Sequence, residues 1–169
     1  MAGGLEECSG LAGERGVPFL DRPVEGAPEA AWGDSFFFYD PDDDAASRRM
    51  PFATIVTQDY DGWDTASDLN RPGVFRLNIA VGRTAFEQLT GYPPDEHETR
   101  PVRLDYTALD RLIPHPAYAA QAWVSILNPG EATAGQARAL LTDAHARAVR
   151  RHDRRRGGHR GVEVPRPAR

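Results

Sequence analysis

The sequence predicts a single α+β domain, in which an antiparallel sheet of about four strands has helices packed on one face. Two observations lead to this class. Three strand-like runs follow one another between residues 30 and 81, before most of the helical patterns begin. Strands in a run followed by helices are typical of α+β folds, and the regular βαβ alternation of a doubly wound parallel sheet does not occur. A chain of 169 residues allows one compact core with tails.

The first predicted elements come from residue types that favour strands. Residues 5–15 predict a short helix broken by glycines, and residues 21–28 form a connector rich in Pro and Gly. Residues 30–39 are aromatic-rich and residues 51–58, PFATIVTQ, are rich in β-branched side chains. Both compositions are typical of strands, and the polar loop between them indicates an antiparallel hairpin.

A third strand is predicted at residues 73–81, GVFRLNIAV, after a long irregular polar segment at 59–72. Leu77 and Ile79 fall on one face of this strand, whereas Arg76 and Asn78 fall on the other. Such alternation predicts a half-buried strand with its polar face toward solvent.

Helices and one more strand complete the prediction. The spacing of Thr84 and Glu87 fits a capping box, and Gly91 fits the end of the same helix. Asp105 is expected to cap a short helix that ends at Pro114. Residues 122–127, AWVSIL, predict the fourth strand.

The last helix is predicted to start at a second capping box. Thr133 and Gln136 provide its spacing. The apolar face of this helix then consists of small and aliphatic side chains at helical spacing: Ala137, Leu140, Leu141, Ala144 and Ala148.

Charge is distributed unevenly along the chain. Residues 147–169 hold nine Arg and two acids (9 − 2 = +7), whereas residues 1–146 hold 11 Arg and 23 acids (11 − 23 = −12). We therefore expect a poorly defined segment at 1–28, one folded domain at 29–152 and a disordered Arg-rich tail at 153–169. A basic tail can bind phosphates, but no aromatic side chain is interleaved for base stacking, so nucleic acid is the less favoured partner.

Composition and motifs argue against several classes. No apolar run approaches the ~20 residues that span a bilayer, and the first residues lack the pattern of a secretory signal. The single cysteine, Cys8, cannot form an internal disulfide or a cysteine-based zinc site. We expect a cytoplasmic protein that has no cofactor, does not bind membranes and has no metal site. His145 and His152 lack the spacing of a helical zinc pair, and the Asp-rich run from Asp40 lacks the later ligands of a calcium loop.

Three stretches resemble a known family. They are AWGDSFFFYDPD, PFATIVTQDYDGWDTASDLNRPGVFRLNIAVGR and PHPAYAAQAWVSILNPGE. They closely resemble an uncharacterised, mainly actinobacterial domain-of-unknown-function family, number 6194, and the resemblance covers about residues 29–152. It implies no catalytic residues, because the family has no assigned activity. Residues 1–20 depart from the family's amphipathic first helix.

The end of the chain also has a weaker, architectural resemblance. The run HPAYAAQAWVSIL followed by ARALLTDAHARA looks like the closing strand and helix of the MmcQ/YjbR-like proteins. That resemblance implies a small α+β fold similar to the frataxin-like one, and for those proteins a DNA-binding role has been suggested. It covers about a third of the chain and concerns the fold alone.

Candidate functional residues gather in and around the 59–72 segment. A long polar loop beside a sheet is typical of a binding rim. The ligand-binding candidates are Trp63, Asp68, Asn70, Arg71, Arg76 and Asn78. Structural alternatives also exist. The loop residues can bond to local backbone, and Arg76 can face solvent and pair with Asp34 or Asp59.

His115 and Asp34 are the catalytic candidates. His115 lies between two prolines, which would hold it rigidly, and Asp34 is a carboxyl group within an otherwise apolar strand. The leading prediction is a binding or accessory module for a polar small molecule or a protein. One alternative is a small hydrolase-like enzyme that uses His115 with a nearby carboxylate. Another is a nucleic-acid-associated module that uses the Arg-rich tail. Whether the protein is an enzyme stays open at this point.

Overall fold

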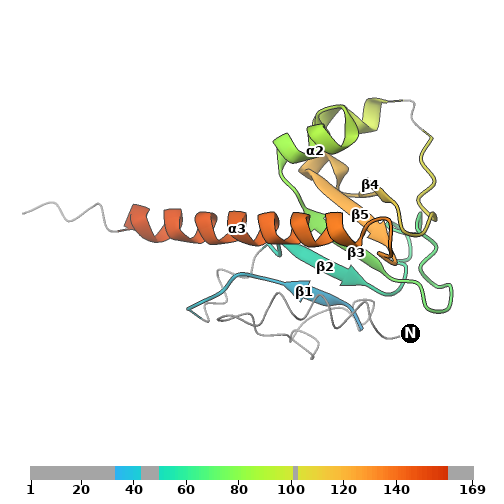
Figure 1. Cartoon of the computed structure of the whole chain (residues 1–169), viewed down its shortest axis with the longest axis horizontal. Coiled ribbons are helices and arrows are strands. Elements are labelled where there is room, and N and C mark those ends of the chain that lie inside the picture. The colour runs from blue at the N-terminus through green and yellow to red at the C-terminus, as the bar shows by residue number, and fades with distance from the viewer. Residues whose placement is uncertain (1–32, 43–49, 101–102, 160–169) are drawn as a thin grey trace, which may run out of the picture.

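The computed structural model describes residues 33–42, 50–100 and 103–159. Its centre is a five-stranded antiparallel sheet with the strand order β1-β2-β3-β5-β4 (Figure 1). The strands are β1 (Ser35–Phe37), β2 (Ala53–Val56), β3 (Arg76–Ala80), β4 (Leu112–Pro114) and β5 (Trp123–Leu127). The helices are α2 (Arg83–Thr90), α3 (Ala134–His159) and two 3-10 helices at Pro94–Thr99 and Ala119–Gln121. The predicted α+β class is confirmed, with five strands in place of about four. The helix expected at 5–15 lies outside the described residues.

The register of the sheet separates two faces. Ala53 pairs with Ile79 and Leu77 pairs with Ile126, so the apolar residues of β2, β3 and β5 lie on one face. This face packs against the small side chains of α3. The cluster includes Ile55, Leu77, Ile79, Val124, Ile126, Ala137, Leu141, Ala144 and Ala148. The predicted apolar face of the last helix is therefore confirmed.

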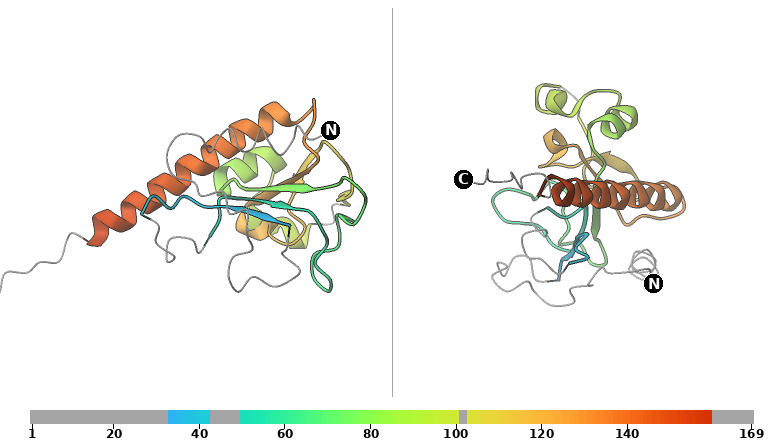
Figure 2. Two further views of the ribbon diagram at one scale, coloured as in Figure 1. Left: turned by 90° about the horizontal axis from the view of Figure 1, so that it is seen from below. Right: turned by 90° about the vertical axis from the view of Figure 1, so that its left-hand side faces the viewer.

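Helix α3 is longer than the sheet that it covers. It lies across one face, and its C-terminal part extends past the strands (Figures 1 and 2). The helix runs to His159, so residues 153–159 are helical rather than part of the expected tail, and 160–169 lie outside the described residues. None of the helices in the described ranges has the length and apolar character needed to cross a membrane.

The face of the sheet opposite α3 is polar and buried. Arg76 and Asn78 of β3 are each only 1% exposed, and Ser125 of β5 is fully buried. The sequence prediction of a half-buried strand with a solvent-facing polar side is therefore wrong. The polar side chains are buried because the 59–72 segment and its neighbours cover part of this face and provide hydrogen-bond partners.

The segment before Pro114 also differs from its prediction. Asp105 accepts hydrogen bonds from the backbone and hydroxyl of Thr107, which closes a turn instead of starting a helix. Asp110 has a positive φ of 52°, which interrupts any helix there, and its backbone N–H donates to the carbonyl of Leu127. Leu112 to Pro114 then pair with β5 as an edge strand. The pairing with a distant strand outweighs the local helical pattern.

Neither predicted capping box forms. Helix α2 starts after Gly82 without a side-chain cap, although Gly91 ends it in the left-handed conformation as expected. At the start of α3, the hydroxyl of Thr133 donates to Asp110. Asp110 also accepts the backbone N–H groups of Gly130, Ala132 and Thr133. These bonds lower the pKa of Asp110 to about 2, with the Thr133 hydroxyl bond as the largest cause.

Asp110→Ala is expected to destabilise the protein, because the loop that leads into α3 loses the acceptor of four hydrogen bonds. The native pKa lies below the ordinary value, so the charged carboxylate stabilises the fold above about pH 4. This stabilisation is lost as the pH falls toward 2. Urea unfolding midpoints between pH 7 and pH 2.5 should show the gap between wild type and variant closing as the pH falls. Asp61→Ala, at an exposed loop position, is the control; an equal effect there would contradict the assignment.

Candidate functional site

The 59–72 segment is held in shape by its own side chains. Tyr60 and Asp64 form an isolated antiparallel bridge. The carboxylate of Asp59 accepts the N–H of Leu69 at 2.9 Å, and the side-chain oxygen of Asn70 accepts the N–H of Asp59 at 3.3 Å. Leu69 is 1% exposed and packs with residues of β2 and β5. The segment is therefore an ordered cover of the sheet and not a loose rim.

Arg76 is the central polar residue beneath this cover. Its guanidinium donates to both carboxylate oxygens of Asp64, and Nη1 also donates to the hydroxyl of Ser67 at 2.8 Å. The side chains of this ion pair are only 1% and 2% exposed. The expected pairing of a solvent-facing Arg76 with Asp34 or Asp59 is therefore wrong. Nε of Arg76 is buried without a hydrogen-bond partner among the described residues.

Asn78 connects three strands. Its amide nitrogen donates to Thr54 of β2 at 2.9 Å, and its amide oxygen accepts the hydroxyl of Ser125 of β5 at 2.8 Å. The short chain of bonds satisfies polar groups that burial would otherwise penalise. Internal partners thus bind both terminal nitrogens of Arg76 and the side-chain amide of Asn78, and a ligand-binding role for either stays a prediction.

Asp34 lies beside β2 and is also bonded internally. It accepts a hydrogen bond from the hydroxyl of Tyr60, and another from the backbone N–H of Thr57 at 2.8 Å. Burial raises the pKa of Asp34, and these hydrogen bonds oppose part of that shift. Burial and the neighbouring Asp34 raise the pKa of Tyr60. The phenol therefore stays protonated and donates its hydrogen to the carboxylate.

His115 is 2% exposed at the end of β4. Its Nδ1 accepts the backbone N–H groups of Ala117 and Tyr118 at 3.0 and 3.1 Å. Burial, with a smaller contribution from Arg76, lowers its pKa to about 2. No carboxylate of the described residues bonds to the ring. A neutral imidazole whose Nδ1 lone pair is already occupied is a poor general base, so a catalytic role for His115 stays an unsupported prediction.

The other four predicted ligand-binding residues lie nearer the surface. Arg71 donates to the carbonyls of Ser67, Asp68 and Thr107, which ties the cover to the 103–111 segment. Trp63 is 53% exposed, and its ring lies 5.2 Å from that of Tyr60 and 5.7 Å from that of Tyr118. The cover therefore meets the loop after His115 through an exposed aromatic contact. Binding by Trp63, Asp68, Asn70 or Arg71 stays a prediction.

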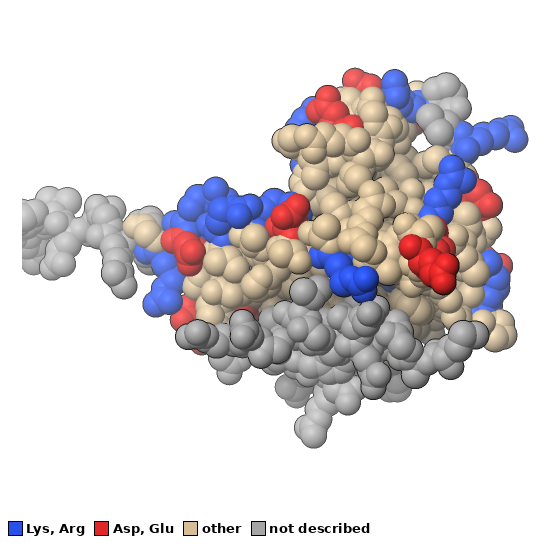
Figure 3. Space-filling view, in the orientation of Figure 1, with Lys and Arg blue, Asp and Glu red and all other residues tan. Residues whose placement is uncertain are grey.

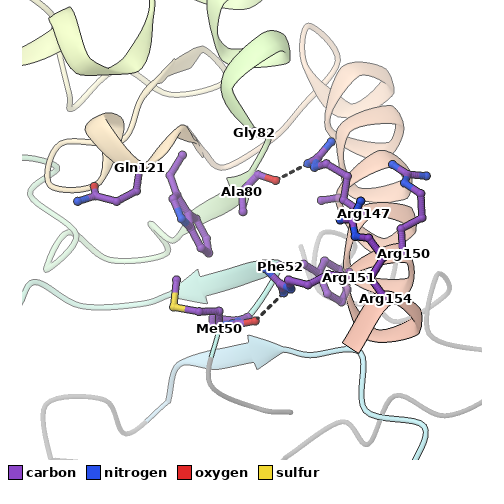
Figure 4. Close-up of a pocket in the computed structure, with 13 residues that line it drawn as sticks. Met50, Phe52, Ala80, Gly82, Gln121, Arg147, Arg150, Arg151 and Arg154 are labelled. Carbon is purple, nitrogen blue, oxygen red and sulfur yellow. Dashed lines mark hydrogen bonds between the residues drawn. The ribbon is translucent and has the colours of Figure 1, made fainter. Parts of the chain in front are cut away.

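A pocket on another part of the molecule was not predicted. It lies where β2 begins, β3 ends and β5 begins, against the C-terminal half of α3, and has a volume of about 340 Å³ (Figure 4). One wall consists of four arginines of α3: Arg147, Arg150, Arg151 and Arg154. The remaining lining is largely apolar and includes Met50, Phe52, Trp123, Ala144 and Ala148. No acidic residue belongs to the described lining.

The four arginines differ in how they are held. Arg147 donates to the carbonyl of Ala80 at the end of β3, and Arg151 donates to the carbonyl of Met50 at 3.2 Å (Figure 4). Burial lowers the pKa of both, and neighbouring arginines lower it further. Arg150 and Arg154 have no hydrogen bond or ion pair with any described residue. Arginine side chains gather along this end of α3 at the surface (Figure 3).

One signal in the sequence could have identified this pocket. Residues 147, 150, 151 and 154 have the spacing i, i+3, i+4 and i+7, which places them on one side of a helix. The residues opposite them come from three distant strand ends, which only the fold brings together. Within the described part of the chain, no group of three His, Cys, Asp or Glu is arranged to hold a metal ion.

Breaking the Arg76–Asp64 pair is expected to be costly. Arg76→Met leaves the Asp64 carboxylate buried and unpaired, which costs about 3–5 kcal/mol of unfolding free energy. Asp64→Asn should cost a similar amount, and the double variant should cost clearly less than the sum. The exposed pair of Arg83 and Asp95, 2.7 Å apart, is the matched control, and Arg83→Met should cost about 1 kcal/mol or less. Denaturant unfolding of these variants measures the coupling; additive losses would contradict a direct pair.

The low pKa of His115 predicts acid sensitivity. In the unfolded chain this side chain gains a proton below about pH 6.5, whereas in the fold it stays neutral until about pH 2. The unfolded state therefore binds more protons between these values, and stability falls as the pH falls. At pH 5 the loss relative to pH 8 should be about 2 kcal/mol. His115→Asn keeps an acceptor without titrating, so its unfolding free energy should lack this part of the pH dependence. Identical pH profiles would refute the assignment.

Comparison with known proteins identifies the family of the chain. No curated protein and no solved structure matches it, so the architectural resemblance to MmcQ/YjbR-like proteins stays an expectation. The model of a family of unknown function, DUF6194, matches residues 5–157, which is most of the chain. The match includes every strand of the sheet and nearly all of α3. The chain therefore belongs to the DUF6194 family of unknown function.

Proposed function

We propose that this protein is a binding module for a small anionic molecule, which it holds in the pocket between α3 and the ends of β2, β3 and β5. One observation carries the proposal: four arginines line a pocket of about 340 Å³ that contains no acidic residue among its described lining. This volume lies at the small end of the range for small-molecule sites. The proposal keeps the predicted class of binding module and moves its site away from the 59–72 segment.

The charge of the pocket favours an anion. Burial lowers the pKa of Arg147 most, and the neighbouring Asp143 raises it. Arg150 and Arg151 lower it further, because adjacent guanidinium groups repel one another. A bound anion would relieve this repulsion. Arg150 and Arg154 have no hydrogen bond or ion pair with the described residues, and the planar guanidinium matches carboxylate and phosphate groups with two parallel hydrogen bonds. The site therefore has unused binding capacity for a group with negative charge.

The two alternatives have less support. An enzyme based on His115 would need a base with a free lone pair and a nearby carboxylate. A nucleic-acid module would use the exposed arginines of α3, but Arg151 is tied to a backbone carbonyl and Arg156 pairs with Asp42 at 3.1 Å. The proposal places the protein in the cytosol, where a lone thiol such as Cys8 stays reduced.

Titration calorimetry with inorganic pyrophosphate tests the proposal on the full chain. We expect saturable binding at one site, weakened at least about 10-fold in the Arg150→Gln/Arg154→Gln variant, because two guanidinium contacts are lost. These two residues have no bond to the described fold, so the variant should retain wild-type stability. Arg155→Gln, on the same helix but outside the pocket lining, is the matched control and should bind nearly as wild type.

Two results would count against the proposal. No binding of pyrophosphate at low salt would remove it. Equal weakening by Arg155→Gln, with tighter binding of a generic DNA duplex than of pyrophosphate, would favour the nucleic-acid alternative. That alternative also predicts a steep fall of duplex affinity with salt.

A further inference from the structure

We infer that the anion is a phosphate ester with a planar aromatic group, of the nucleoside monophosphate class. The inference rests on the proposed function and adds the chemistry of the ligand. Its basis is that the pocket has two unlike walls: guanidinium groups on α3, and aromatic and aliphatic side chains opposite them. A ligand that uses both walls must carry a charged group and an apolar ring.

The basic wall fits a phosphate better than a single carboxylate. Four arginines of α3 line one small volume, and the described lining contains no carboxylate. A phosphate monoester carries close to two negative charges near neutral pH and three oxygens that accept hydrogen bonds. It can therefore accept bonds from several arginines at once, whereas one carboxylate engages a single guanidinium fully.

The start of α2 contributes to the same wall. Gly82 lines the pocket and precedes α2 with a φ of 77°, a conformation that favours glycine, and the helix start has no side-chain cap. Its first turn also lacks acidic residues. Gly82 lies next to Arg147, since a side chain added at this position would come 3.5 Å from the Arg147 Nε. Gly82, where α2 begins, thus lies beside Arg147 at the pocket.

The opposite wall would be unused by inorganic phosphate. Met50 and Phe52 border the pocket (Figure 4), and Trp123 also lines it. Met50 is 53% exposed at the rim, whereas Phe52 and Trp123 are 9% and 7% exposed. An apolar group of the ligand that covers Met50 would remove its exposed side chain from water. A planar ring also contacts both kinds of neighbour well, because it packs on an aromatic side chain and accepts a guanidinium over its face.

Calorimetry with three probes tests the inference on the full chain: adenosine monophosphate, inorganic phosphate and adenosine. We expect the monophosphate to bind about 10-fold or more tightly than inorganic phosphate, since a base–aromatic contact contributes on this scale. Adenosine alone should bind more weakly than the monophosphate by a similar or larger factor. The Arg150→Gln/Arg154→Gln variant should lose most of the difference between the monophosphate and adenosine.

Tryptophan fluorescence provides a readout that locates the ring. Replacing Trp32 and Trp63 by Phe leaves Trp123 as the single tryptophan. The monophosphate should then quench its emission, whereas inorganic phosphate should not. Met50→Ala, at an exposed rim position, should weaken the monophosphate without affecting inorganic phosphate.

The outcomes separate the two proposals. If pyrophosphate binds but the monophosphate is no tighter than inorganic phosphate, the inference fails and the anion-binding function stands. If Trp123 emission does not respond to bound monophosphate, the inference fails as well. If neither pyrophosphate nor the monophosphate binds, both proposals fail.

Discussion

The buried guanidinium of Arg76 is the constraint on which the rest of the polar face depends. A charge inside a sheet requires an opposite charge with matching geometry, because an unpaired ion would cost several kcal/mol of desolvation. Asp64 provides that charge and Ser67 the additional acceptor. The 59–72 segment must therefore lie across the sheet at this point. Its contacts with the loop after His115 follow from the same placement, since Trp63 then reaches Tyr118.

The two faces of the sheet are buried in different ways. One face uses aliphatic side chains against the alanines and leucines of α3. The other combines hydrogen bonds and an ion pair with a smaller apolar cluster beneath an irregular segment. Because α3 extends past the sheet, its later turns have a side that faces strand ends and not the core. The arginines of those turns border the pocket. The functional surface that we propose is thus a by-product of the mismatch between the length of α3 and the width of the sheet.

Regular spacing of apolar side chains predicted two elements correctly, although both pack against distant parts of the chain. The alternation in residues 73–81 predicts β3, and the spacing from Ala137 to Ala148 predicts the apolar side of α3. The prediction of a short helix after Asp105 is wrong. The positive φ of Asp110 and the pairing of the following strand with β5 replace the helix, and both depend on contacts across the fold. The burial of Arg76 had no local signal, since alternation alone is typical of a solvent-facing polar side. The arginine spacing on α3 was visible in the sequence, but what those residues face was not.

The uneven distribution of charge along the chain has a kinetic consequence. Residues 147–169 carry +7 and residues 1–146 carry −12, and the described arginines of the basic part lie toward one end of a long helix. Among the described residues, basic side chains therefore concentrate toward the end of α3. This concentration attracts an approaching anion toward that end of the helix and raises its association rate. This electrostatic attraction is screened beyond about 10 Å at 0.1 M salt, so the ionic strength of the cell limits the distance over which it acts.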